Sequence, residues 1–221
     1  GVYISEPEAI STGITKDFSN RFTKNPTCFV NSLSDLPFIQ ESISPSENNF
    51  LTSEFTNLEI RDTVFLLAAD KSPEPGGFPA QFYKKYWHIV GNSVIRSVKA
   101  FFHSGKLLKE ANHTFLALIP KVDKPETSNH FRPISLCSTI YKIIAKLMAN
   151  RLKVVLPNSI QPCQGAFTPN RFIQDNILTS HEIFNAFKKK KGKHGWIAIK
   201  LDMEKAYDRL DWEFIRICLE K

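Results

Sequence analysis

Two short, continuously apolar runs constrain the fold of this chain more than any other feature. The first is TFLALIPK, from Thr114 to Lys121, and the second is WIAIKL, from Trp196 to Leu201. Uninterrupted apolar runs of this kind, bounded by polar residues or proline, are typical of buried strands. We therefore expect two buried strands, one from which Lys121 emerges and one that delivers Asp202 at its end.

Helical spacing marks the first part of the chain. Apolar residues spaced four apart, from Ile10 to Phe22, predict a helix over residues 6–22. The next thirty residues are rich in Ser, Asn and Pro and are expected to form a linker. Thr56 and Glu59 have the spacing of a capping box, which predicts a helix from there to about residue 69.

Further helices are predicted beyond a loop over residues 71–79. Two short helices should end at Gly91 and Gly105, because glycine commonly follows the last helical turn. A longer amphipathic helix from about residue 140 should stop at Pro157, and Asp211 should cap a last helix.

Composition sets broader limits on the kind of protein this is. The 221 residues carry a net charge of +7 and are 42% apolar, which suits a folded protein with a polyanionic partner. Four widely separated cysteines suggest neither a zinc ribbon nor a disulfide framework, so a reducing compartment is expected. No apolar run approaches the roughly 20 residues that span a bilayer, so no membrane partner is expected.

The segment LDMEKAYDR, from Leu201 to Arg209, is the first candidate for chemistry. A carboxylate at the end of a buried strand is anchored by the sheet and still reaches beyond it, as a Mg²⁺ ligand must. The alternative is that Asp202 only ends a strand and caps the next turn.

This segment resembles the first catalytic motif of the palm in reverse transcriptases of non-LTR (LINE-type) retroelements. Its detailed amino-acid sequence is similar to that of plant elements of this type. The resemblance implies that Asp202 is a ligand of the catalytic metals and that Tyr207 abuts the sugar of the incoming deoxynucleotide. Asp208 belongs to the motif as a structural residue. The alternative for Tyr207 is a half-buried packing residue.

A second resemblance lies upstream, where ALIPK, ending at Lys121, is followed by FRPISL, which contains Arg132. Together they resemble the fingers motif of the same family, in which a Lys and an Arg converge on the nucleotide triphosphate. A compact ammonium and a planar guanidinium suit that task. The alternatives are a solvated strand end for Lys121 and a structural hydrogen bond for Arg132.

The run QGAFTPNR, from Gln164 to Arg171, resembles the next block of the family, which supports the nucleotide pocket and the template. Gly165 would let nucleic acid approach the backbone, and Arg171 would contact phosphate. Arg171 could equally pair with Asp175, one helical turn further on.

Two other segments are less clear. Residues 71–79 (KSPEPGGFP) resemble a loop that precedes the fingers, but Glu74 replaces a glycine of the family pattern and Gly76 replaces an aspartate. Decay of an inactive copy would explain both changes. The tract from Lys188 to Lys193 is expected to be a solvated connection that adds salt-sensitive attraction to nucleic acid.

The resemblance implies an α+β fold comprising the fingers and part of the palm of a right-hand polymerase, truncated before the second palm motif and the thumb. Residues 1–55 are expected to be a divergent helical and linker segment, and residues 56–221 to be the incomplete reverse transcriptase. Because no double-Asp motif follows, the isolated chain is expected to be inactive. The alternatives are a noncatalytic nucleic-acid-binding relic with a basic fingers surface and, less well supported, a nuclease built on Asp202.

The same resemblance implies the cofactor and partners of the whole enzyme. It would transfer nucleotidyl groups with Mg²⁺, using an RNA template, a DNA primer and deoxynucleoside triphosphates. An intracellular location, in the nucleus or the cytoplasm, is expected on this basis.

Overall fold

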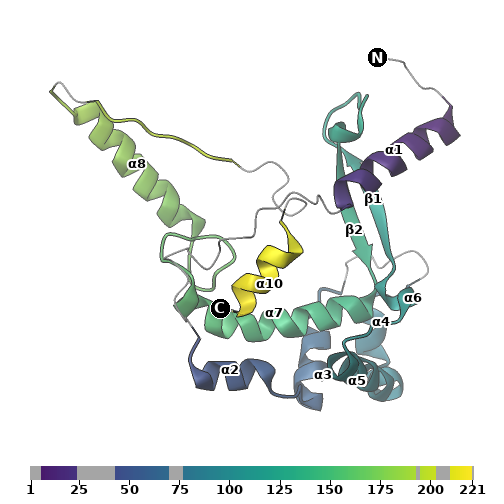
Figure 1. Ribbon diagram of the computed structural model, residues 1–221. Helices are drawn as coiled ribbons and strands as arrows, with labels where there is room; N and C mark the ends of the chain where they lie inside the picture. Colours follow the sequence, from purple (N-terminus) through teal and green to yellow (C-terminus); the bar gives the residue numbers. More distant parts are fainter. Residues whose placement is uncertain (1–5, 24–42, 70–76, 193–194, 203–209, 221) are drawn as a thin grey trace. The chain divides into compact units, whose positions relative to one another are not determined.

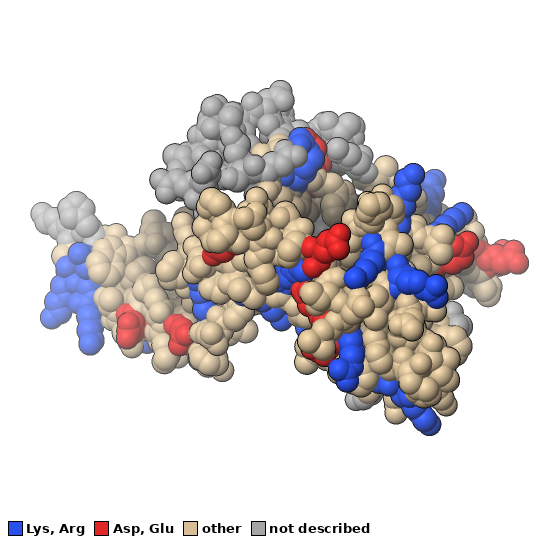
Figure 2. Space-filling view, turned by 90° about the horizontal axis from the view of Figure 1, so that it is seen from below, with Lys and Arg blue, Asp and Glu red and all other residues tan. Residues whose placement is uncertain are grey.

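The structure is a computed structural model that describes residues 6–23, 43–69, 77–192, 195–202 and 210–220 (Figure 1). It divides into two compact units, one formed by Ile43–Pro157 and one by Gly1–Ser42 with Asn158–Lys221. The boundary predicted at residue 56 thus falls inside the first of these units. Lys and Arg side chains are spread widely over the face in Figure 2, in keeping with the net charge of +7.

The unit of residues 43–157 is mainly helical. Its helices are α2 (Pro45–Thr52), α3 (Asn57–Leu66), α4 (Ala80–Lys85), α5 (Trp87–Ser104), α6 (Lys109–Asn112) and α7 (Thr139–Ser159), which ends just beyond the unit. Helix α2 was missed, because it lies in the segment predicted to be a linker. Its signal was a capping box, in which Ser44 Oγ accepts from the Glu47 amide and Glu47 bonds back to the Ser44 amide.

Three helices of this unit share one hydrophobic core. Buried side chains of α3, α5 and α7 meet there, each at most 3% exposed, and Phe55 at 8% closes the cluster beside the start of α3. Burying one such aliphatic side chain stabilises a fold by about 1.5–3 kcal/mol. The members of the core are Phe55, Ile60, Val64, Val94, Val98, Ile143, Ile144 and Leu147.

A buried arginine joins α7 to the start of α3. Arg151 is 4% exposed, and its Nε and Nη2 donate to the two carboxylate oxygens of Glu59 at 2.8 and 3.0 Å. The guanidinium also lies 3.6 Å from the ring centroid of Phe55. Its other donors bind the carbonyl oxygens of Leu51, Ser53 and Glu54.

The sheet in the described residues is a single antiparallel hairpin of β1 (Thr114–Pro120) and β2 (Phe131–Cys137), joined by a loop that holds the 3₁₀ turn η2 (Ser128–His130). The strand predicted at residues 114–120 is confirmed, but its burial was wrong. No residue of either strand is buried, since a two-stranded ribbon has no further layer of this unit to cover it.

The unit of residues 1–42 and 158–221 contains α1 (Pro7–Phe22), α8 (Ile173–Lys189) and α10 (Trp212–Glu220). The predicted helix over residues 6–22 is confirmed, with Pro7 in its first turn. The predicted cap of the last helix is also confirmed, because Asp211 Oδ1 accepts from the amides of Glu213 and Phe214 at 2.8 and 3.3 Å.

The second predicted strand does not form. Residues 195–202 have no regular secondary structure, and Ile197, Ile199 and Leu201 are 79–89% exposed. A strand needs a neighbour for its amide and carbonyl groups, and β1 and β2 pair only with each other in the part of the chain described. The apolar pattern alone could not supply that neighbour.

Two predicted helix ends were also wrong. Gly91 lies inside α5, where a Cβ would come within 2.8 Å of the Trp87 indole, so its small size serves packing. Helix α7 continues past Pro157 to Ser159. The predicted end at Gly105 is confirmed: its φ is +67°, and its backbone N–H donates a hydrogen bond to the Phe101 carbonyl oxygen.

None of the described helices is long and apolar enough to span a membrane.

Candidate functional site

The end of the β1–β2 hairpin brings together the two cations predicted to contact a triphosphate. Lys121 directly follows β1, and its amide donates to the His130 carbonyl at 2.7 Å. Arg132 is the second residue of β2 and lies opposite Ile119 in the register. The hairpin therefore places both cations at the same end of the pair.

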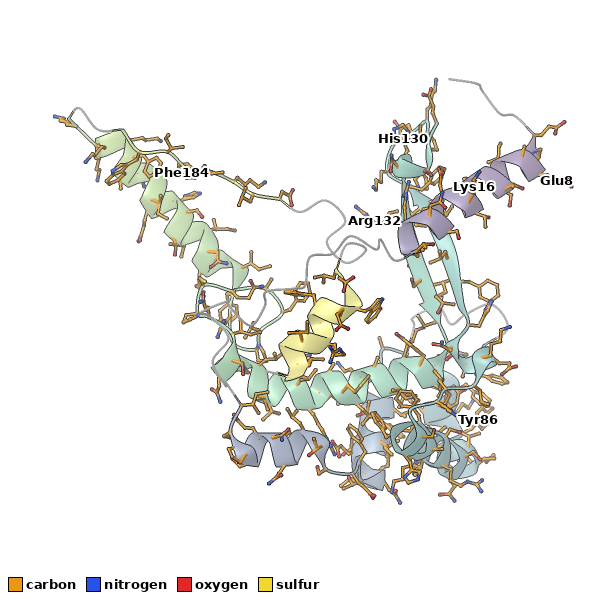
Figure 3. All side chains as sticks on the ribbon, viewed as in Figure 1. Glu8, Lys16, Tyr86, His130, Arg132 and Phe184 are labelled. Carbon is orange, nitrogen blue, oxygen red and sulfur yellow. The ribbon has the colours of Figure 1, made fainter. Side chains whose placement is uncertain are left out.

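The two cations also share one face of the hairpin. Side chains alternate between faces along a strand, so Lys121 is on the face of Ile119, and Arg132 joins them as the cross-strand partner of Ile119. Diagonal neighbours of this kind are about 7–8 Å apart. Both cations are exposed, and Figure 3 shows Arg132 near His130 toward the end of the hairpin.

The loop of the hairpin is held by local hydrogen bonds. Lys121 Nζ donates to the Asn129 carbonyl at 3.1 Å, and the Glu126 amide donates to His130 Nδ1 at 3.1 Å. A lysine ammonium carries three donors, so one bond to a carbonyl leaves donors and the full charge for a ligand.

An apolar strip leads along the same face to these cations. By alternation it contains Phe115, Ile119 and Ile134, each 41–45% exposed. At its far end Ile134 and Leu136 help to line a pocket of about 360 Å³, which Thr139 and Lys142 of α7 also line. This face therefore offers an apolar surface and a cationic end to one ligand.

The predicted support residues Gln164, Gly165 and Arg171 lie in the loop between α7 and α8. The Arg171 guanidinium donates to three loop carbonyls, those of Ile160, Gln161 and Gln164, at 2.5–3.1 Å. These bonds give Arg171 a structural role within its own loop, and the phosphate contact and the pairing with Asp175 stay predictions. Nothing in the local sequence indicated these bonds, because the accepting carbonyls lie seven to eleven residues before Arg171.

Gly165 is buried, and the protein itself occupies the space beside it. A Cβ there would lie 2.9 Å from Asn176 Nδ2, which donates to the Cys163 carbonyl, and 3.3 Å from the Phe172 carbonyl oxygen. Atoms of α8 and of its N-cap Phe172 thus lie close to the Gly165 backbone, and the approach of nucleic acid stays a prediction. Gln164 is exposed, and its Nε2 donates to the Ala166 carbonyl at 3.1 Å.

The same loop holds an aromatic residue that sequence patterns did not single out. Phe167 has φ +63° and is 85% exposed, an unusual combination for a bulky side chain. The bonds made by Arg171 and Asn176 hold this loop, and such over-determination allows a strained backbone to persist.

Of the predicted catalytic motif, the structure describes Asp202 but not the residues that follow it. Asp202 is exposed and follows the unpaired segment 195–201, whereas Tyr207 and Asp208 lie outside the described residues. Of the predicted nucleotide contacts, the structure brings together Lys121 and Arg132.

The donor set for a metal is incomplete in the described residues. No three His, Cys, Asp or Glu side chains gather there in a way that would hold an ion. Asp202 alone supplies one carboxylate, and two dications need several oxygen ligands. The carboxylate oxygens of Asp202 are suitable ligands for Mg²⁺. The described residues, however, do not provide enough further ligands for a complete metal site.

Comparison with known proteins agrees with these features. Residues 119–221, which include both hairpin cations and Asp202, match the family described as reverse transcriptase (RNA-dependent DNA polymerase). The chain is also 29% identical over 215 residues to the "Transposon TX1 uncharacterized 149 kDa protein" of Xenopus laevis, across 97% of this chain and 16% of that protein. The mixed helices and small sheet are consistent with a reverse-transcriptase-like polymerase fold. Together these matches support a partial reverse transcriptase of a non-LTR, LINE-type transposable element.

Proposed function

We propose that this chain supplies the fingers and the first palm motif of an enzyme that copies RNA into DNA. The observation that carries the proposal is the pair of exposed cations, Lys121 and Arg132, on one face at the end of the hairpin. The chain spans about a sixth of the transposon protein it matches, so the activity of a whole protein is itself part of the proposal.

The hairpin face would hold the triphosphate of a deoxynucleotide. Arg132 would grip phosphate oxygens with its planar fork, and Lys121 would add a compact positive charge on a neighbouring phosphate. A separation of about 7–8 Å between diagonal residues lets both long side chains reach one triphosphate. The apolar strip would lie beside the less polar part of the nucleotide.

Asp202 and Tyr207 would act on the same nucleotide. Mg²⁺, when bound, supplies the charge that activates the primer hydroxyl and offsets the charge on the leaving phosphates. Asp202 would provide one ligand of that metal site. Tyr207 would occupy the volume that a ribose 2′-hydroxyl needs, so deoxyribose is accepted and ribose is rejected.

The 221-residue chain by itself should extend no primer. The printed sequence contains no pair of adjacent aspartates, and Asp202 cannot hold two metals alone. The test is an extension assay with RNA template, DNA primer, deoxynucleotides and Mg²⁺. Extension that Asp202→Ala abolishes would show that the missing ligands are present after all.

Nucleotide binding tests the hairpin directly in the 221-residue chain. Arg132→Ala and Lys121→Ala should each weaken binding of a labelled deoxynucleoside triphosphate by roughly tenfold, since each removes charge-assisted hydrogen bonds. Lys124→Ala is the matched control, because Lys124 is an exposed cation of the same loop. Equal losses in all three variants would reduce the hairpin to a nonspecific positive charge and contradict the proposal.

The catalytic roles need the chain joined to a palm and thumb that carry a double-Asp motif. There Asp202→Ala should abolish extension with little change in primer–template affinity. Tyr207→Ala should admit ribonucleotides at little cost to deoxynucleotide use. If Asp202→Ala keeps near-normal extension, or Tyr207→Ala loses both substrates together, the assigned roles are wrong, and a noncatalytic nucleic-acid-binding function becomes the better description.

A further inference from the structure

The imidazole of His130 belongs to the same face of the hairpin as the two cations of the proposed nucleotide site. The Lys121 amide donates to the His130 carbonyl, which continues the strand register by one step and sets these two residues directly opposite each other. Cross-strand partners share a face, and so do residues two apart on one strand, which adds Arg132. Directly opposed residues have Cβ atoms about 4.5–5.5 Å apart. His130 is therefore a close neighbour of Lys121.

Three hydrogen bonds fix the position of His130. Its carbonyl oxygen accepts from the Lys121 amide at 2.7 Å, and its own amide donates to the Thr127 carbonyl at 3.0 Å. Its ring Nδ1 accepts from the Glu126 amide at 3.1 Å. Bonds of the backbone and of the ring thus hold the imidazole in one orientation, and the residue is half-buried.

The bond to Nδ1 also determines which ring nitrogen carries the proton. A nitrogen that accepts a hydrogen bond has no proton of its own, so the proton of the neutral ring is on Nε2. Nε2 has no hydrogen-bond partner among the residues that the structure describes. The loop therefore holds a fixed N–H donor beside two cations.

A neutral donor suits this position better than a third cation. An imidazolium would lose the bond from the Glu126 amide, and it would add a positive charge beside Lys121 and Arg132. The neutral ring avoids this repulsion and still donates in a direction that the loop sets. A charged phosphate oxygen is the acceptor that makes such a bond strongest.

We propose that His130 binds the triphosphate of the incoming deoxynucleotide through its Nε2–H, as a third donor beside Lys121 and Arg132. This inference rests on the proposed function of the hairpin face and adds a residue to it. The two cations supply charge on long side chains with many rotamers, whereas His130 supplies one donor from a fixed position. Its task is to orient a phosphate group that the cations attract.

Two substitutions separate this task from a purely structural one. In His130→Asn the side-chain amide reaches only as far as Nδ1 did, so its oxygen can accept from the Glu126 amide while the distal donor is lost. In His130→Gln the amide reaches as far as Nε2 did, so a donor is kept while the loop bond is lost. Fluorescence anisotropy measures the binding of a labelled deoxythymidine triphosphate to each variant of the 221-residue chain.

We expect His130→Asn to weaken triphosphate binding by roughly three- to tenfold, as the loss of one hydrogen bond would, and His130→Gln to weaken it less. His103→Asn is the matched control, because His103 is an exposed histidine in the last turn of α5, and it should keep the original affinity. If His130 only holds the loop, Asn is tolerated and Gln is not. That order, equal losses in the two His130 variants, or an equal loss in the control would overturn the inference.

NMR of the isotope-labelled imidazole nitrogens tests the tautomer, with His130→Gln identifying the signals. At about pH 8, where ordinary histidines are neutral, Nε2 should carry the proton, and inorganic tripolyphosphate should slow its exchange with water. A proton on Nδ1, or no response to tripolyphosphate at saturation, would contradict the proposal. The proposed function fails separately, when Lys121→Ala and Arg132→Ala lose no more affinity than Lys124→Ala.

Discussion

Replacing Arg151 by Met is the sharpest test of what holds the unit of residues 43–157 together. The substitution keeps a long side chain that can stay against Phe55, but it removes the buried guanidinium. Two bonds to the Glu59 carboxylate are lost. Three backbone carbonyls, one in the last turn of α2 and two in the segment between α2 and α3, lose their donor as well.

The expected loss of stability follows from the burial of the two partners. Breaking a buried ion pair by removing one partner costs about 3–5 kcal/mol. The side chain of Arg151 is 5% exposed and that of Glu59 is 32% exposed, so the abandoned carboxylate can regain water. We therefore expect a loss of about 3 kcal/mol, the lower end of that range. A domain is commonly stable by only about 5–15 kcal/mol, so the change is large.

Urea unfolding followed by far-ultraviolet circular dichroism measures this loss. With a slope of about 1–3 kcal/mol per molar urea, the midpoint should fall by about 1–3 M. Lys153→Met is the matched control, because Lys153 is exposed on the same helix and its loss should change stability by less than about 0.5 kcal/mol. A loss under about 1 kcal/mol for Arg151→Met would refute the view that this arginine joins α7 to α3.

Three further outcomes are expected. The hydrogen bond from Arg151 lowers the pKa of Glu59 below its ordinary value of 4.5, so the ionised carboxylate stabilises the fold above that pH. When unfolding is measured against pH, the stability of the protein should decline as the pH falls below 4.5, and it should decline less steeply in Glu59→Gln. Thermal melts should show Phe167→Gly more stable than Phe167→Ala by about 1 kcal/mol, because only glycine relieves the left-handed backbone; equal stability would contradict the assigned strain. Gly165→Ala should destabilise its loop by about 1–3 kcal/mol in urea unfolding, whereas Gly13→Ala, with no atom within 4 Å of the new Cβ, should not.

Local signals predicted the helix ends well where the cause is itself local. The capping box of Thr56 and Glu59, the left-handed Gly105 and the cap at Asp211 all form as expected. Each depends on residues at most four apart, so the sequence contains the whole interaction. The hairpin position of Lys121 also followed from the local end of an apolar run.

The features that sequence patterns missed depend on distant residues. Gly91 was expected to end a helix, but its contact with the Trp87 indole inside α5 decides its role. The helical spacing of Arg151 placed it on the apolar side of α7, yet nothing local indicated a partner 92 residues earlier. The run from Trp196 to Leu201 has the composition of a buried strand, but composition does not provide a pairing partner.

The exposed hairpin also bears on how the chain avoids aggregation. Because Lys121 and His130 form a hydrogen-bonded pair, alternation turns the backbone groups of residues 120 and 133 outward, toward the two open edges. Both positions are proline, which has no amide hydrogen to offer a passing strand. Each edge therefore lacks one of its outward-facing donors, which makes that part of the hairpin a poorer template for pairing with another chain.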